Sequence, residues 1–328
     1  MGRWVVVVPT IRKECIEEFL GAWRAEFLGQ RVVVVEDNPK KSFSLPSWVE
    51  HYSWEEINGE LGKDAWIIPR RSDTVRSFGY FKAWQGKPDY ILTLDDDCLP
   101  EKDYGERGFL GKLEENLAKK WPDDSWWNTL SDEVCPRGYP YGVREVKRET
   151  VMHHGLWSNV PDLDARTQKK RGDYRTSPAR KLELVPRGRF FPMCGMNLAF
   201  KPKVVPMLYF MLMGKDWTGK PWPYDRFGDI WAGVFAKKIC DHLGWAVTSG
   251  APSVHHAKAS DVEVNWEKEK PGVPVNEMLW QRVERVCLSE KSVGRCYLQL
   301  AEQLDMEGEY WGTLKQAMRI WVGLFEKC

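Results

Sequence analysis

The sequence predicts an α/β fold with a doubly wound, mostly parallel sheet, and three observations support this. Short apolar runs rich in β-branched residues occur at residues 4–8, 31–35 and 90–94. Apolar residues with helical spacing lie between these runs. No hairpin signal joins the runs, so the β-α-β-α-β order favours parallel strands with right-handed crossovers.

The elements of the first third follow one another along the chain. The run Trp4–Val8 stops at Pro9 and predicts a buried first strand. Between residues 14 and 27, apolar side chains return every three or four positions, which indicates a helix packed on the sheet. The pattern continues with a strand over residues 31–35, a helix around residues 74–85 and a strand over residues 90–94.

The rest of the chain divides into a loop-rich middle and a helical end. Residues 121–192 are rich in Trp, Pro, Gly, Arg and Asp with little periodicity, which predicts long, ordered active-site loops. Apolar spacing returns at Met193–Met213 and Ile230–Leu243, and it is helical from about residue 276. The proline-rich stretch around residue 270 predicts a catalytic domain over residues 1–270 and a helical extension over residues 271–328 packed on it.

Composition excludes several function classes. A net charge of +1 provides no overall field for binding nucleic acid or an anionic membrane. The N-terminal apolar run and the run Val204–Met213 are too short for a signal peptide or a membrane span. The eight scattered cysteines have no metal-like spacing, so we expect reduced thiols and a cytoplasmic protein. Eighteen tryptophans suggest subunit contacts besides core packing, and we expect a homo-oligomer.

Polar residues follow each of the early strands. Thr10 and Arg12 follow the first strand, Glu36 and Asp37 end the second, and Asp95–Asp97 end the third. The carboxyl ends of parallel strands meet at one edge of a sheet, where open α/β sheets place their ligands. We therefore expect these side chains to line one crevice.

The segment ILTLDDDC, residues 91–98, carries the most specific signal. Adjacent carboxylates repel one another, so such a cluster is stable mainly in solvent or around a cation. A solvated acidic turn and a metal site explain the three aspartates equally well on their own. The other polar strand ends favour a divalent cation that joins Asp95, Asp96 and Asp97 to the diphosphate of a sugar nucleotide.

Three arginines are candidates for holding that diphosphate. Arg137 and Arg144 lie in RGYPYGVRE, and Arg76 lies in VRSFGY before the acidic strand. Guanidinium groups match phosphate oxygens bidentately. The alternative for any one of them is a surface ion pair.

Two further segments are candidates for contact with the substrate. His154 and Trp157 lie in HHGLWSNVPDLDARTQ, which fits a sugar-binding loop or an acid-capped turn. Gly195 and Asn197 begin an apolar element in FPMCGMNLAF. Glycine there permits close approach to a ligand or forms a turn.

Two later segments complete the candidates. Asp229 precedes a helical pattern, where an aspartate is commonly a cap, and a catalytic role is the alternative. His256 and Lys258 follow an apolar run that ends in HHAKAS. Imidazole binds Mn²⁺-type ions and a lysine neutralises phosphate, whereas a lone histidine is more often structural.

The motifs together resemble the plant reversibly glycosylated polypeptides, that is, the UDP-arabinopyranose mutases. The resemblance extends over roughly residues 5–325 in family order. Its matching pieces are VVPTIR, RSFGY, LDDDC, NTL, RGYP, HGLW, NVPDLDARTQ, FPMCGMNLAF, YFMLMG, WAG, ICDHLG and HAKAS.

The resemblance implies a GT-A-like fold and a cytosolic enzyme that uses Mn²⁺ or Mg²⁺. Family members are isomerases that interconvert UDP-arabinopyranose and UDP-arabinofuranose, and they become glycosylated on an arginine. That arginine matches Arg137, and a second important arginine matches Arg144. His256 falls where GT-A enzymes often supply a metal ligand beside the acidic motif. The residues expected to bind substrate are Thr10, Arg12, Asp37, Arg76, Asp95, His154, Trp157, Asn197 and Lys258.

The chain also departs from the family pattern. The family usually has two acids before the WAG element, and here Gly228 replaces the first and leaves Asp229. His255 stands where the family has an aromatic residue, and an extra Trp-rich segment occupies residues 215–223. These changes keep two alternatives to the mutase open: a transferase to an external acceptor, and a non-catalytic nucleotide-sugar-binding scaffold.

Overall fold

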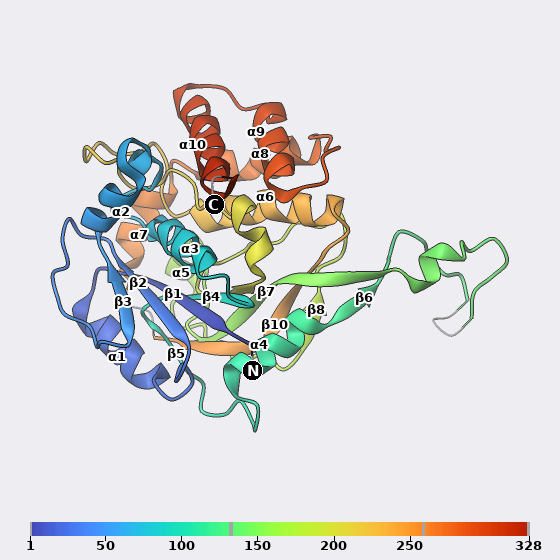
Figure 1. The fold of residues 1–328 in the computed structure, drawn as a ribbon, viewed down its shortest axis with the longest axis horizontal. Helices are drawn as coiled ribbons and strands as arrows, with labels where there is room; N and C mark the ends of the chain where they lie inside the picture. Colours follow the sequence, from blue (N-terminus) through green and yellow to red (C-terminus); the bar gives the residue numbers. More distant parts are fainter. Residues whose placement is uncertain (1, 131–133, 258–259, 327–328) are drawn as a thin grey trace.

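The computed structural model describes residues 2–130, 134–257 and 260–326, and its strands form a mixed sheet surrounded by helices (Figure 1). The described strands are β1 (Trp4–Thr10), β2 (Arg31–Glu36), β3 (Val49–Tyr52), β4 (Tyr90–Leu94), β5 (Cys98–Leu99), β6 (Lys120–Pro122), β7 (Lys147–Asn159), β8 (Leu182–Leu184), β9 (Asn197–Phe200) and β10 (Ala246–His256). Their order across the sheet is β3-β2-β1-β4-β9-β7-β10-β5, with β6 on β7 and β8 on β10.

The predicted parallel arrangement is confirmed for the N-terminal half of the sheet. Strand β1 lies parallel to both β2 and β4, and β2 lies parallel to β3. Strand β9 then enters antiparallel between β4 and β7, because it follows a loop rather than a crossover helix. Strands β7 and β10 are parallel to each other. The sheet as a whole is therefore mixed, with its parallel part where the polar strand ends were predicted.

Helices cover both faces of the sheet, so the doubly wound α/β architecture is confirmed. Side chains alternate between the faces along β1: Val5 and Val7 belong to one hydrophobic cluster, and Val6 and Val8 to the other. The described α-helices are α1 (Lys13–Trp23), α2 (Trp54–Leu61), α3 (Arg76–Gln85), α4 (Gly108–Ala118), α5 (Ala165–Lys170), α6 (Gly228–His242), α7 (Val262–Glu269), α8 (Val273–Glu284), α9 (Val293–Gln303) and α10 (Glu309–Glu326). Helices α1 and α4 pack on one face, and α3 and α6 pack on the other.

The C-terminal helices extend the larger of the two clusters. Helices α8, α9 and α10 stack beyond α6 (Figure 1), and their apolar side chains join the cluster that contains α3. Tyr310 donates to the carbonyl of Leu212 at 3.0 Å, and the Trp321 indole donates to the carbonyl of Val205 at 3.3 Å. The predicted helical end is confirmed, while the division near residue 270 stays a prediction. No described helix is long and apolar enough to cross a membrane.

The middle of the chain differs from the predicted set of active-site loops. Strand β7 runs through it, and the sequence pattern missed this strand because the polar residues Arg148, His153 and His154 are buried within it. Strand β6 pairs with the start of β7. Residues 123–130 and 134–146 lie beyond this pairing and project away from the body (Figure 1), and we call them the arm.

Candidate functional site

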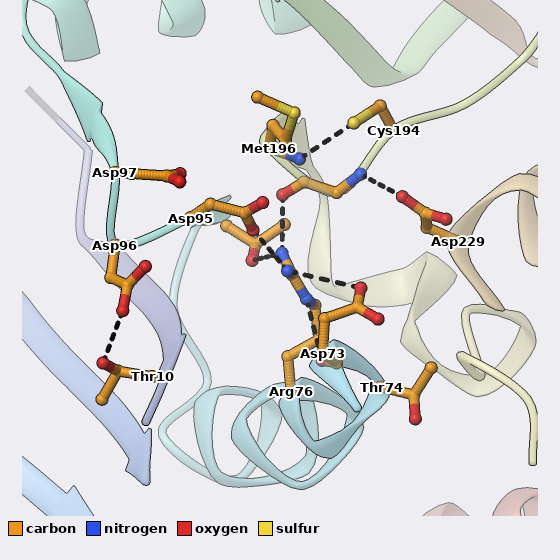
Figure 2. Close-up of polar contacts among 12 residues, drawn as sticks. Thr10, Asp73, Thr74, Arg76, Asp95, Asp96, Asp97, Cys194, Met196 and Asp229 are labelled. Atoms are coloured by element: carbon orange, nitrogen blue, oxygen red, sulfur yellow. Dashed lines mark hydrogen bonds and ion pairs between the residues drawn. The ribbon is translucent and has the colours of Figure 1, made fainter. Parts of the chain in front are cut away.

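The ends of β1 and β4 are joined by hydrogen bonds to Asp96. Thr10 donates its hydroxyl to Asp96 at 2.6 Å (Figure 2), and the Arg12 guanidinium forms an ion pair with the same carboxylate. Nη2 of Arg12 also lies 3.4 Å from Oδ2 of Asp97. Burial raises the pKa of Asp96, and Arg12 opposes that rise. Thr10, Arg12 and Asp96 therefore meet as the sequence predicts.

Arg76 at the start of α3 organises the other side of the acidic motif. Its side chain is only 1% exposed, and it forms an ion pair with Asp95 (Figure 2). Its Nη1 donates to the hydroxyl of Thr93 at 3.0 Å and to the carbonyl of Gly195 at 2.7 Å. Arg76 is therefore placed to position Asp95 and the loop before β9 together.

The backbone of Gly195 is held from both sides. Its carbonyl accepts from Arg76, and its N–H donates to Oδ2 of Asp229 at 2.9 Å (Figure 2). A Cβ at this position would lie 2.8 Å from Nη1 of Arg76, so only glycine fits without displacing that guanidinium. The N-cap position of α6 is Phe227, and Asp229 lies in the first turn. Its Oδ1 accepts from the Ile230 N–H at 2.9 Å, while its Oδ2 contacts the loop before β9.

The surroundings of Asp229 change its acidity. Burial and the nearby carboxylates of Asp73 and Asp162 raise the pKa of Asp229 to about 7. The Gly195 N–H and Arg76 act in the opposite direction. A carboxyl group with such a pKa both accepts and releases a proton near neutral pH.

Asp97 and His256 are the pair with the donor chemistry for a divalent cation. Nδ1 of His256 lies 2.7 Å from the carbonyl oxygen of Val160, so in the neutral ring Nδ1 carries the proton. The unprotonated Nε2 then faces Oδ1 of Asp97 at 3.8 Å. Two acceptor atoms that face each other in this way suit a bound cation, and the carbonyl contact is a typical outer-shell contact of a metal-binding histidine.

The described residues do not assemble a larger set of protein ligands. No group of three or more His, Cys, Asp or Glu side chains with metal-binding geometry occurs within them. Asp95 is paired with Arg76, and Arg12 forms ion pairs with both Asp96 and Asp97. The described chain thus fits a cation held by Asp97 and His256, with the remaining positions left to substrate and water.

Asp37, another predicted substrate residue, lies next to the strand ends. Asp37 follows β2 and accepts from the Trp54 indole at 2.7 Å and from the Ser72 N–H at 2.8 Å. Burial raises the pKa of Asp37. Its carboxylate thus joins the start of α2 to the segment before α3.

His154, Trp157 and Asn197 are close to one another in β7 and β9. The rings of His154 and Trp157 have centroids 5.7 Å apart, and burial lowers the pKa of His154 to about 4. The amide nitrogen of Asn197 donates to the carbonyls of Leu156 and Pro252, both at 3.0 Å. In the described residues, Nε2 of His154 and Oδ1 of Asn197 are buried without a hydrogen-bond partner.

The two predicted catalytic arginines lie elsewhere. Arg137 and Arg144 are exposed on the arm, and the structure does not bring them to Asp95–Asp97 within one chain (Figure 1). Arg144 stacks on the Tyr141 ring at 4.3 Å and donates to the carbonyl of Tyr139 at 3.1 Å. The predicted phosphate ligand Lys258 lies outside the described residues.

Sequence reasoning gave no role to two acids beside Asp229. Asp73 lies 3.5 Å from Nη2 of Arg76, and its position three residues before that arginine was the available signal. Asp162 was noted only as part of a polar segment, and it shares the electrostatic environment of Asp229 and Cys194. Asp162 affects Asp229, which lies far away in the sequence on α6. No local sequence pattern reveals such a relationship.

Sequence comparisons with known proteins point in one direction. The sequence model of a family described as "Reversibly glycosylated polypeptide" matches residues 3–328. UDP-arabinopyranose mutase 3 of Arabidopsis thaliana is 36% identical over 98% of this chain and 90% of its own length. UDP-arabinopyranose mutase 1 of Oryza sativa subsp. japonica is 35% identical over the same shares. Among solved structures, apo mouse xyloside xylosyltransferase 1 aligns at 10% identity with a TM-score of 0.27, over 61% of this chain and 67% of that one.

Proposed function

The chain belongs to the reversibly glycosylated polypeptides, and from this we propose that it is a UDP-arabinopyranose mutase. It interconverts the pyranose and furanose forms of UDP-arabinose and is an isomerase. Relatives that carry this name match it over 98% of its length. One structural observation supports the proposal. Four side chains lie around the ends of β1, β4 and β10, namely Asp97, His256, Arg76 and Asp229.

Asp97 and His256 are the residues proposed to hold Mn²⁺ or Mg²⁺. When bound, such a cation accepts diphosphate oxygens and stabilises the negative charge of departing UDP. The carbonyl of Val160 keeps the His256 ring oriented. Arg12 and Arg76 fix the neighbouring carboxylates, so that the strand end keeps its shape when a charged substrate enters.

Asp229 is proposed to move the proton that the isomerisation requires. When the anomeric C–O bond to UDP breaks, the bonding electrons leave with the diphosphate. The attack of the sugar's 4-hydroxyl on the anomeric carbon releases a proton. UDP then attacks the anomeric carbon again as the bond from this carbon to the old ring oxygen breaks, and that oxygen takes up a proton. A single carboxyl group with a pKa near 7 accepts the first proton and returns it in the second step.

Arg137 and Arg144 are proposed to stabilise the departing diphosphate rather than to carry the sugar. A guanidinium group has a pKa above about 12 and stays protonated, so it is a poor nucleophile. Self-glycosylation is then a side reaction of a stabilised sugar cation. We also propose a cytoplasmic location, in keeping with the free thiols of the described cysteines.

The deciding experiment uses purified protein, UDP-arabinopyranose and Mn²⁺ without any sugar acceptor. We expect UDP-arabinofuranose to form until the two isomers reach equilibrium, as followed by chromatography and NMR. Asp97→Ala should lose this activity, and Asp173→Asn, at an exposed aspartate, should keep it. Absence of the furanose product, together with transfer to an added acceptor, would establish the external transferase instead.

A further inference from the structure

Arg226 has a backbone conformation that is unusual for a large side chain. Its φ is 64°, in the left-handed region that favours glycine and asparagine. Arg226 directly precedes Phe227, the N-cap residue of α6, and the first turn of this helix carries Asp229. Strained backbone of this kind persists only where the surrounding structure imposes it, and it concentrates at functional sites.

Two ion pairs hold the segment that contains Arg226 against α7. Nε of Arg226 donates to Oε1 of Glu269 at 3.0 Å, and Nζ of Lys268 lies 3.1 Å from Oδ2 of Asp225. The Glu269 side chain is only 8% exposed, and its Oε2 accepts from the Ala165 N–H at 2.8 Å. Glu269 thereby joins the start of α5 to the segment before α6. The Arg226 guanidinium is therefore fixed at its Nε side.

The other edge of this guanidinium is open to a ligand. In the part of the chain that the structure describes, the side-chain hydrogen bond of Arg226 is made by Nε, and none is made by Nη1 or Nη2. The side chain is 32% exposed, so a ligand can approach these two nitrogens. Their N–H groups form a planar fork that matches two oxygens of a phosphate.

Arg226 shares its surroundings with Asp229. Burial lowers the pKa of Arg226, but Glu269, Asp162 and Asp73 raise it by more. Asp73 and Asp162 are also the carboxylates that, together with burial, raise the pKa of Asp229. Asp73 and Asp229 both lie at the site (Figure 2). Arg226 is thus part of the site within one chain.

The position of Arg226 indicates which part of the substrate it meets. Asp229 is proposed to act on the sugar, and the β-phosphate of a sugar nucleotide is bonded to the anomeric carbon of that sugar. A group beside Asp229 therefore lies next to the β-phosphate. The carboxylates of Asp73 and Asp162 repel a diphosphate there, and a fixed guanidinium offsets this repulsion.

We propose that Arg226 binds the β-phosphate of the sugar nucleotide through Nη1 and Nη2, while Glu269 holds the guanidinium in place. The inference rests on the proposed function, because it assigns a further residue to the same substrate. When the bond between the anomeric carbon and the β-phosphate oxygen breaks, the electron pair stays on that oxygen. Arg226 stabilises this charge from within the chain, in addition to the cation proposed at Asp97 and His256.

The affinities for UDP and UMP test the contact, in the double variant Arg226→Asn/Glu269→Gln. Asparagine tolerates the left-handed backbone. The glutamine keeps an acceptor for the Ala165 N–H and avoids a buried carboxylate without its cation. In isothermal titration with Mn²⁺ present, UDP affinity should fall by at least about 10-fold. UMP affinity should change by less than about threefold, since UMP has no β-phosphate.

Lys268→Ala is the matched control. It removes the neighbouring ion pair between α7 and the same segment and leaves Arg226 in place. Both affinities should stay within about twofold of the wild type, because this pair is partly exposed. Circular dichroism checks that both variants are folded. A double variant that binds UDP like the wild type overturns the inference, and so does an equal loss for UDP and UMP.

The mutase activity of the wild type separates this inference from the proposed function. An active wild type beside a double variant with unchanged UDP affinity overturns the role of Arg226 and leaves the mutase intact. A wild type that binds UDP but forms no UDP-arabinofuranose overturns the mutase, and the comparison of UDP with UMP still decides on the phosphate contact. A wild type that binds neither nucleotide contradicts both.

Discussion

Nε2 of His256 lies 3.8 Å from Oδ1 of Asp97. The carbonyl of Val160 accepts from Nδ1 of the same ring and fixes the orientation of the imidazole. The divalent cation that we propose for this site would link the end of β4 to β10 through these two atoms.

Removal of the imidazole tests this site. His256→Ala should weaken Mn²⁺ binding by at least about 10-fold, since even outer-shell changes cost about 10–100-fold. His255→Ala is a matched control, because neighbouring residues of β10 point to opposite faces of the strand. Isothermal titration of Mn²⁺ into the protein with UDP provides the measurement. Equal Mn²⁺ affinity of the two variants contradicts the assignment.

Arg76 should be essential for stability as well as for the shape of the site. Arg76→Ala removes the partner of Asp95 and leaves the carbonyl of Gly195 without its donor, so the free energy of unfolding should fall by about 3–5 kcal/mol. The exposed pair of Arg3 with Asp89 serves as the control, and Arg3→Ala should cost much less than Arg76→Ala. Urea denaturation distinguishes the two. Similar losses of unfolding free energy in both variants would contradict the stabilising role assigned to Arg76.

Asp229 should make stability depend on pH. Its pKa of about 7 in the native state exceeds the ordinary value of about 3.9, so the native protein binds more protons than the unfolded chain between these values. Stability therefore falls as pH rises from about 4 to 7, and the loss is complete above pH 7. Asp229→Asn should remove this decline, whereas Asp173→Asn should retain it. Denaturant titrations at several pH values measure the slope, and an unchanged slope in Asp229→Asn refutes the shifted pKa.

The space beside Gly228 is already filled by a neighbouring side chain. A Cβ at residue 228 would lie 2.4 Å from the Cγ2 methyl of Thr74. Gly228→Ala should therefore destabilise the protein by about 1–3 kcal/mol through overpacking. Thr74→Ser removes that methyl group, so Gly228→Ala/Thr74→Ser should recover most of the loss in thermal unfolding. Additive losses in the double variant would show that another neighbour causes the clash.

The sequence predicted the elements whose apolar pattern is regular. Strands β1 and β4 and the C-terminal helices follow this pattern, because their side chains alternate or repeat against one core. Strand β7 escaped because Arg148, His153 and His154 interrupt its apolar pattern although they are buried. A buried polar residue with partners in other elements cannot be distinguished from a loop residue by periodicity.

The candidate site was also predictable only where it follows from the regular strand pattern. Polar strand ends placed Thr10 beside Asp96 correctly, because parallel strands end at one edge. The pairing of Asp95 with Arg76 and the contact of Asp229 with Gly195 depend on how α3 and α6 pack. The position of Arg137 depends on the direction of the arm, which the ion pairs of Arg148 and Arg187 determine from distant segments.

The shared core of β1 and α10 has a consequence for how the protein is made. Val5 and Val7 of the first strand and Trp321 of α10 belong to the same hydrophobic cluster. A chain that emerges from the ribosome N-terminus first cannot close this cluster until α10 has been synthesised. The sheet face beneath α3 and α6 then stays partly uncovered during translation, which is the state in which chains aggregate or bind chaperones.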